Sequence, residues 1–98
     1  MELRQTRRYA DWFDRLRDQR AKARIDARLL RFRLGNPGDV KSVGDGVQEM
    51  RIDYGPGYRV YFTRVGEMIV LLLAGGDKST QQADIDAAKR IAREERGT

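Results

Sequence analysis

Cysteine and histidine are both absent from this chain of 98 residues. Without cysteine, neither disulfide bonds nor thiolate metal sites can form, and the composition fits a reducing compartment. The absence of histidine removes the commonest general base and the commonest transition-metal ligand. The carboxylates show no metal-binding spacing, and no nucleotide-binding glycine motif precedes a helix. The sequence therefore predicts neither a metal site nor a cofactor.

Long apolar segments are also lacking. The first residues, MELRQTRRYADWF, contain no apolar signal core, and no apolar run approaches membrane-spanning length. We therefore expect a soluble, cytoplasmic protein that does not enter a membrane. With 98 residues and 40% hydrophobic composition, the chain is large enough for one domain with a single modest core. The expected domain spans residues 1–98.

The charge of the chain is basic and unevenly distributed. Lys and Arg number 20 against 15 Asp and Glu, a net charge of +5. Residues 1–35 hold 11 basic and 5 acidic side chains, so they carry the whole surplus. Sixteen of the basic residues are arginine, which binds phosphate in a bidentate manner, although a GC-rich genome would raise the arginine count equally well. This balance favours nucleic acid or another polyanion as ligand.

The first half of the sequence predicts a strand and two helices. Residues 2–5 alternate in polarity and are expected to form a short edge strand. Thr6 is expected to cap a first helix with core-facing aromatics, and Asp18 begins a second helix that reaches about Leu34. A basic stripe, which is either solvated or faces a polyanion, follows the second helix: Arg20, Arg24, Arg28 and Arg31.

The second half predicts a loop, three strands and a helix. Residues 35–46 are expected to form an irregular loop, and loops of this length often carry function. Three antiparallel strands follow: Val47–Tyr54, Tyr58–Val65 and Met68–Ala74. The last of these strands is apolar on both sides and is expected to be central. Ser79 and Gln82 then form a capping-box pattern that opens a final helix.

These elements predict an α+β fold in the order β-α-α-β-β-β-α. The two N-terminal helices are expected to pack on one face of an antiparallel sheet. Period-2 alternation assigns four apolar side chains to that covered face: Met50, Ile52, Val60 and Phe62. The opposite face is expected to remain partly open.

The open face is predicted to hold the chemically useful side chains. Alternation places four of them together: Glu49, Arg51, Arg59 and Tyr61. Lys78 lies just past the third strand, where it could reach over the same face. The plainer interpretation is a solvated sheet face with cross-strand ion pairs.

The functional interpretation of this face is RNA cleavage by attack of a ribose 2′-hydroxyl on its adjacent phosphate. Arginine side chains would stabilise the negative charge of the phosphorane. Without histidine, the proton transfers would fall to Glu49, Tyr61 or a lysine. None of these side chains has an ordinary pKa near 7, so the sequence predicts a weak enzyme or one that a partner completes.

Two stretches of the chain carry a family resemblance, RFRLGNPGDVKSVGDGVQEMRIDYGPGYRVYF and LLLAGGDKSTQQADIDAAKRIA. They resemble addiction-module killer proteins of the HigB-like branch of the RelE/ParE toxin superfamily, and the likeness runs from WFDRLRDQRAKARI onward. The resemblance implies a bacterial type II toxin with the compact RelE-like fold. It also implies a small helix-turn-helix antitoxin as partner. Most RelE- and HigB-like toxins are ribosome-dependent endoribonucleases that cut mRNA.

The resemblance also implies site residues. The GYR motif of the family appears as Gly57-Tyr58-Arg59, which makes Arg59 the candidate phosphate-binding arginine. No tyrosine follows Tyr61, so the C-terminal catalytic tyrosine of some relatives has no counterpart. The predicted catalytic set is Arg51, Arg59, Lys78, Tyr61 and Glu49. The predicted RNA-binding set is Lys41, Arg20, Arg24, Arg28 and Arg31.

Two alternative functions remain open on the sequence. One is a ParE-like inhibitor of DNA gyrase, which needs no active site. The other is a nucleic-acid-binding protein without catalysis, which the lack of a standard acid–base pair allows. The retained basic residues on one sheet face favour the nuclease.

Overall fold

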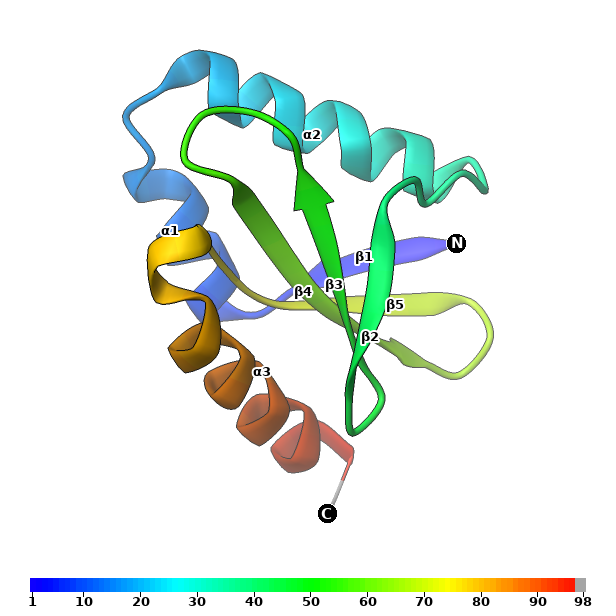
Figure 1. Cartoon of the computed structure of the whole chain (residues 1–98). Coiled ribbons are helices and arrows are strands. Elements are labelled where there is room, and N and C mark those ends of the chain that lie inside the picture. The colour runs from blue at the N-terminus through cyan, green and yellow to red at the C-terminus, as the bar shows by residue number, and fades with distance from the viewer. Residues whose placement is uncertain (97–98) are drawn as a thin grey trace.

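The computed structural model describes residues 1–96, which form one α+β unit, as predicted (Figure 1). The elements are β1 (Glu2–Gln5), α1 (Arg7–Arg15), α2 (Gln19–Arg33), β2 (Val40–Gly44), β3 (Val47–Ile52), β4 (Tyr58–Val65), β5 (Ile69–Gly76), a 3₁₀ helix η1 (Lys78–Thr80) and α3 (Gln81–Arg96). Helices α1 and α2 lie on one side of the sheet and α3 lies on the other (Figure 1). Among residues 1–96, no helix is both long and apolar enough to cross a membrane.

The five strands form one sheet in the order β1-β5-β4-β3-β2. Strands β2 to β5 pair in an antiparallel manner, but β1 pairs with β5 in parallel. The expected edge position of β1 is confirmed, whereas the expected wholly antiparallel sheet is wrong at β1. Strand β5 is interior as its apolar sequence indicated, but β4 is the middle strand.

Strand β2 occupies part of the segment that was expected to be an irregular loop. It pairs with β3 through a tight turn, in which Asp45 and Gly46 have φ angles of 57° and 75°. The segment VKSVG has little apolar periodicity of its own, and its strand conformation depends on the backbone partners that β3 provides. A local pattern could not indicate that pairing.

The apolar layer under α1 and α2 matches the prediction. Met50 and Ile52 on β3, together with Val60 and Phe62 on β4, pack against the buried side chains of α2. Those α2 side chains are Ile25, Leu29 and Phe32. Both predicted helix starts are confirmed, since Thr6 accepts a hydrogen bond from the Tyr9 amide and Asp18 accepts from the Arg20 and Ala21 amides.

Helix α3 packs against the opposite face, which was expected to remain partly open. Its alanines Ala88 and Ala92 are fully buried beside Val47, Tyr61 and Leu73 of the sheet. Small side chains on α3 bring the helix close to the sheet, so this face is covered as far as β3.

The predicted capping box at the start of the last helix is wrong. The Asp77 carboxylate accepts the Ser79 amide and hydroxyl hydrogen bonds, and the 3₁₀ turn η1 separates it from α3. The helix itself begins at Gln81. Asp77 therefore caps the 3₁₀ helix η1, and the hydrogen bonds of Ser79 go to Asp77 and not to the start of α3.

Candidate active site

Four predicted site residues share one face of the sheet, as alternation indicated. In the antiparallel register of β3 and β4, Arg51 lies opposite Arg59 and Glu49 lies opposite Tyr61. Because directly opposed side chains point to the same side of a sheet, the two arginines are neighbours at the end of the strands. Helix α3 covers the Glu49 and Tyr61 pair, whereas the arginine pair lies nearer the edge of that cover.

Glu49 is the centre of a buried polar network. Its side chain is 0% exposed, and its Oε2 atom accepts hydrogen bonds from the Tyr61 hydroxyl at 3.1 Å and the Gln81 amide Nε2 at 2.8 Å. The Arg59 Nε atom lies 3.5 Å from the same oxygen, and Lys41 Nζ lies 4.0 Å from Oε1. Burial of a carboxylate is costly unless it is paired and hydrogen-bonded. Glu49 therefore links its own strand to β2, β4 and α3 through these contacts.

Tyr61 serves this network as a hydrogen-bond donor. Burial, and then the negative charge of Glu49, raise the pKa of Tyr61 well above its ordinary value. The phenol therefore stays neutral and donates to Glu49. Since both side chains are 0% exposed, neither lines the surface at which a substrate would bind. Their predicted part in proton transfer stays a prediction.

Arg59 contacts the Gly57 carbonyl and the Glu49 carboxylate and is mostly buried. Its side chain is 12% exposed, and Nη1 donates to the Gly57 carbonyl at 2.7 Å. Gly57 has a φ angle of 81°, and a Cβ atom there would lie 3.2 Å from Arg59 Nη1. The glycine of the GYR motif is thus required both for its backbone conformation and for the close approach of Arg59.

Lys78 lies against the same turn. Its backbone N–H donates to the Pro56 carbonyl at 3.4 Å, and its Cβ lies near the position that a Gly57 Cβ would occupy, 3.6 Å away. The Lys78 side chain is exposed. The backbone of Lys78 therefore lies beside the Gly57 turn, and the predicted reach of its side chain over the arginine face stays a prediction.

The arginine pair borders a surface hollow of about 340 Å³. Arg51 is 42% exposed and its Nη2 atom lies 3.1 Å from Asp39 Oδ1. The hollow is lined by Asp39, Arg51, Ile52, Asp53, Gly57, Tyr58 and Arg59. Two arginines and two aspartates thus line the same hollow. This arrangement can accept a phosphate if the carboxylates release an arginine or bind other parts of the ligand.

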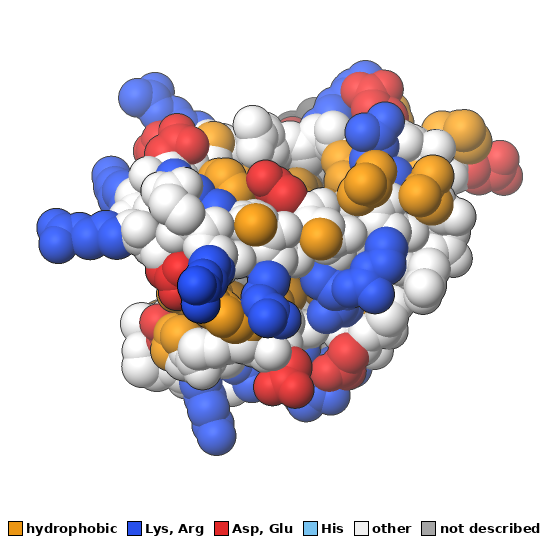
Figure 2. Space-filling view, turned by 90° about the horizontal axis from the view of Figure 1, so that it is seen from above, with side chains coloured by type: hydrophobic (Ala, Val, Ile, Leu, Met, Phe, Trp, Pro, Cys, Tyr) orange, Lys and Arg blue, Asp and Glu red, His pale blue; other side chains and the backbone are white. Residues whose placement is uncertain are grey.

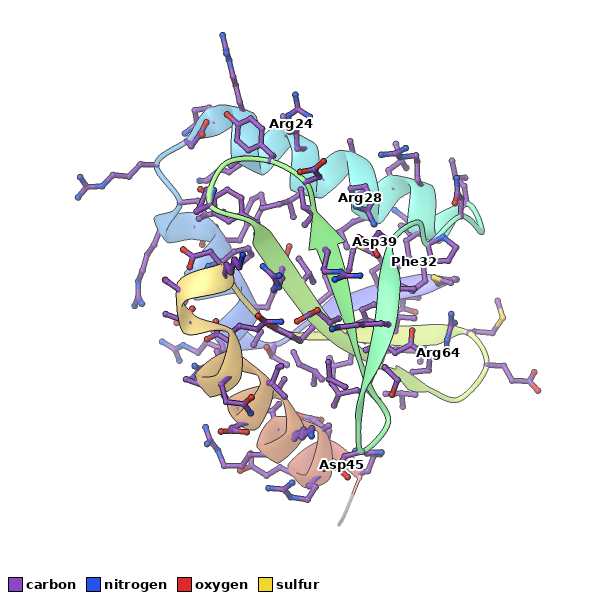
Figure 3. All side chains as sticks on the ribbon, in the orientation of Figure 1. Arg24, Arg28, Phe32, Asp39, Asp45 and Arg64 are labelled. Atoms are coloured by element: carbon purple, nitrogen blue, oxygen red, sulfur yellow. The ribbon has the colours of Figure 1, made fainter. Side chains whose placement is uncertain are left out.

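The basic stripe on α2 divides into structural and exposed members. Arg28 points inward and donates to the backbone carbonyls of Arg51 at 2.5 Å and Pro37 at 3.1 Å, and burial lowers the pKa of Arg28 (Figure 3). The Arg24 guanidinium lies over the Tyr54 ring, 4.7 Å from its centre. Arg28 therefore anchors α2 to the end of β3 and contributes to the fold.

The remaining members of the stripe are exposed. Arg20 and Arg31 are exposed. In the view of Figure 2, Lys and Arg side chains are spread over the surface with acidic side chains between them. A second hollow of about 340 Å³ is lined by Arg24, Ala27, Arg28, Arg31, Ile52 and Asp53. It shares Ile52 and Asp53 with the hollow beside Arg59, so the two adjoin around the end of β3.

Two contributors to the site were not predicted. Gln81 donates to Glu49, and Asp39 pairs with Arg51. Gln81 was missed because the capping pattern placed the start of α3 before it. Asp39 was missed because residues 35–46 were expected to form an irregular loop. Among residues 1–96, no group of three or more acidic, His or Cys side chains could hold a metal ion.

Comparison with known proteins places the chain in a family. The family described as Phage derived protein Gp49-like (DUF891) matches residues 11–96, so the chain belongs to it. This is a toxin–antitoxin-associated family of RelE-like toxins, which is consistent with an antitoxin partner. An uncharacterized protein of Haemophilus influenzae is 49% identical over 94 residues, which cover 96% of this chain and 95% of that protein. No solved structure matches the chain.

Proposed function

We propose that this protein is the toxin of a bacterial type II toxin–antitoxin system and that it cleaves mRNA on the ribosome, as HigB-like toxins do. The observation that carries the proposal is the cationic group at one end of the sheet. Arg51 and Arg59 are cross-strand neighbours, and Lys78 lies against the same turn as Arg59. Two arginines that line one hollow, with Lys78 on the adjoining turn, suit a phosphodiester that gains negative charge during reaction.

In the proposed reaction the ribose 2′ oxygen attacks the adjacent phosphorus. The bond from phosphorus to the 5′ oxygen breaks, leaving a 2′,3′-cyclic phosphate and a 5′-hydroxyl end. Arg51, Arg59 and Lys78 stabilise the phosphorane. One proton leaves the 2′-hydroxyl and one reaches the 5′ oxygen. Because Glu49 and Tyr61 are buried behind the arginines, we propose that ribosomal RNA and water assist these transfers.

The path of the RNA follows from the two adjoining hollows. Arg24 and Arg31 of α2 border one hollow, and the Arg51 and Arg59 pair borders the other. Arg20 lies one helical turn before Arg24 on the same helix. Arginine contacts to phosphate position a nucleic acid without reading its sequence. The proposal therefore assigns Arg20, Arg24 and Arg31 to binding of the RNA backbone next to the cleaved bond, and it assigns Lys41 to the electrostatic surroundings of Glu49.

The activity is tested by inducing the protein in bacteria and mapping mRNA 5′ ends. New ends within translated codons are expected, and Lys78→Ala should reduce them by about a hundredfold. Arg90→Ala, an exposed arginine on α3, is the matched control and should cleave like the wild type. Intact mRNA together with inhibited gyrase supercoiling would instead support the ParE-like function.

The expected antitoxin is tested separately. Positive charge in the first 35 residues and around Arg59 is attractive to an acidic segment of a partner. Co-expression of a small helix-turn-helix gene adjacent to this gene should restore growth. Failure of every neighbouring gene to restore growth would count against the toxin assignment.

A further inference from the structure

Helix α3 meets the sheet mainly through small apolar side chains, but its first residue is an exception. Gln81 extends from the start of α3 to β3, where its Nε2 atom donates to Glu49 Oε2 at 2.8 Å. We propose that Gln81 is a positioning residue for Arg59 and that it acts through the Glu49 carboxylate. This inference rests on the proposed RNA cleavage and names a residue that the reaction depends on without contact to RNA.

The geometry of Glu49 shows why a second donor matters. Its Oε2 atom accepts from Tyr61 on β4 and from Gln81 on α3, so the carboxylate is held from two elements. Its Oε1 atom is buried and makes no hydrogen bond within residues 1–96, and neither does Arg59 Nε. Arg59 Nε lies 3.5 Å from Glu49 Oε2, so the two charges attract each other. Because no hydrogen bond joins these atoms, Arg59 does not fix the orientation of the carboxylate.

The chemical type of Gln81 fits this task. A neutral amide adds a hydrogen-bond donor without adding positive charge. The negative charge of Glu49 is therefore left for Arg59 and Lys41, its two cationic neighbours. A lysine or arginine at position 81 would satisfy the same oxygen but would compete with Arg59 for that charge.

Loss of Gln81 is expected to reduce rate more than binding. The Glu49 carboxylate could then rotate about its remaining bond to Tyr61, and Arg59 would retain only the Gly57 carbonyl as a fixed neighbour. A misplaced catalytic contact of this kind costs on the order of tenfold to a hundredfold in rate. We expect Gln81→Ala to lower kcat about tenfold and to leave KM within about twofold.

The neighbouring glutamine provides a matched control. Gln82 is exposed, and its side chain donates to Asp86 on its own helix, at 3.0 Å. Gln82→Ala removes the same side chain one position away and should keep the wild-type kcat. Equal losses in Gln81→Ala and Gln82→Ala would overturn the inference.

An isosteric change supplies a readout that a merely structural role would not produce. Gln81→Glu places a second carboxyl group beside Glu49, and two carboxyl groups at this distance share one proton. The protonated form can donate to Glu49 as the amide does, whereas the doubly ionised form repels it. The kcat of Gln81→Glu relative to the wild type should therefore rise several-fold as the pH falls from about 8 to about 6. A ratio that does not change with pH would contradict the proposal.

A measurement without RNA separates this inference from the proposed reaction. In ¹⁵N-labelled protein, the Arg59 Nε–H signal, assigned with Arg59→Lys, should be sharp in the wild type and in Gln82→Ala and broadened in Gln81→Ala. An unchanged signal in Gln81→Ala overturns the positioning role even if the protein cleaves RNA. A changed signal in a protein that cleaves no RNA supports the positioning role and refutes the proposed reaction.

Discussion

The two faces of the sheet are both covered by helices, yet they are packed by different kinds of side chain. The face under α1 and α2 is filled by large apolar groups, such as Phe32 and Phe62, whose ring centres are 4.8 Å apart. The face under α3 is packed by alanines. The buried polar side chains found within residues 1–96, Glu49, Thr63 and Asp84, belong to the α3 side.

The face under α1 and α2 mainly stabilises the fold, whereas the face under α3 positions the candidate site. A face that buries mainly apolar groups needs few specific partners, since hydrophobic burial is non-directional. A face that buries a carboxylate must supply donors at defined positions, because an unpaired buried charge is costly. The α3 face can therefore hold Arg59 rigidly at its edge, while the apolar face under α1 and α2 keeps the sheet folded.

The largest expected effect tests the apolar face. Phe32→Ala should lower the free energy of unfolding by about 3–5 kcal/mol, because it leaves a cavity against Phe62. Urea titration followed by circular dichroism measures the change. Leu34→Ala, at a side chain that is 78% exposed, should cost less than about 0.5 kcal/mol. Similar losses in both variants would mean that the apolar face does not dominate stability.

The next effect tests the polar face. Arg59→Lys keeps a cation near Glu49 but loses the planar guanidinium, so mRNA cleavage should fall about a hundredfold with little change in stability. Arg59→Ala removes the cation as well and should cost about 3 kcal/mol in unfolding free energy. Cleavage of mRNA in extracts measures the activity of both variants, and urea titration measures their free energies of unfolding. Wild-type cleavage by Arg59→Lys would exclude a guanidinium-specific role.

A smaller effect tests how the two faces meet at the end of β3. Arg28→Ala removes charged donors from two backbone carbonyls and should destabilise the protein by about 1.5 kcal/mol. Arg24→Ala removes a contact with the Tyr54 ring and should cost about 0.5 kcal/mol. Paired thermal melts compare the variants. A larger loss for Arg24→Ala would contradict the structural role of Arg28.

The smallest effect concerns the α1–α2 junction and depends on pH. The hydrogen bond from the Tyr54 hydroxyl to the Asp18 carboxylate, at 2.9 Å, is the main cause that lowers the pKa of Asp18. A lowered folded pKa means that Asp18 stabilises the fold fully above its unfolded pKa of about 3.9. This stabilisation is lost as the pH falls through the lower folded value. The Tm difference between wild type and Asp18→Asn should therefore shrink below about pH 4.

The control for this pH dependence is Asp14→Asn, an exposed carboxylate that caps no helix. The Tm difference of Asp18→Asn should change more between about pH 7 and about pH 3 than that of Asp14→Asn, because only Asp18 accepts the Tyr54 hydrogen bond. An equal pH dependence in both variants would show that general charge repulsion, and not the Tyr54 contact, is responsible.

Some of the site was predictable because its determinants are local. Period-2 alternation placed Glu49, Arg51, Arg59 and Tyr61 on one face, and the register confirms it. The GYR motif indicated Arg59 beside a turn. The exposure of these residues was not predictable, because it depends on where α3 packs. The expectation of an open face therefore holds best for Arg51 and fails for Glu49 and Tyr61.

The sequence by itself determined the helices, the apolar core and the charge of this protein. Thr6 and Asp18 cap helices through backbone groups two or three residues away, and alternation sorts side chains within a strand without reference to other elements. The tertiary structure decided the direction of β1, the existence of β2 and the contact of Gln81 with Glu49. These features join residues that are distant in the chain, and only the packed backbone brings their hydrogen-bonding partners together.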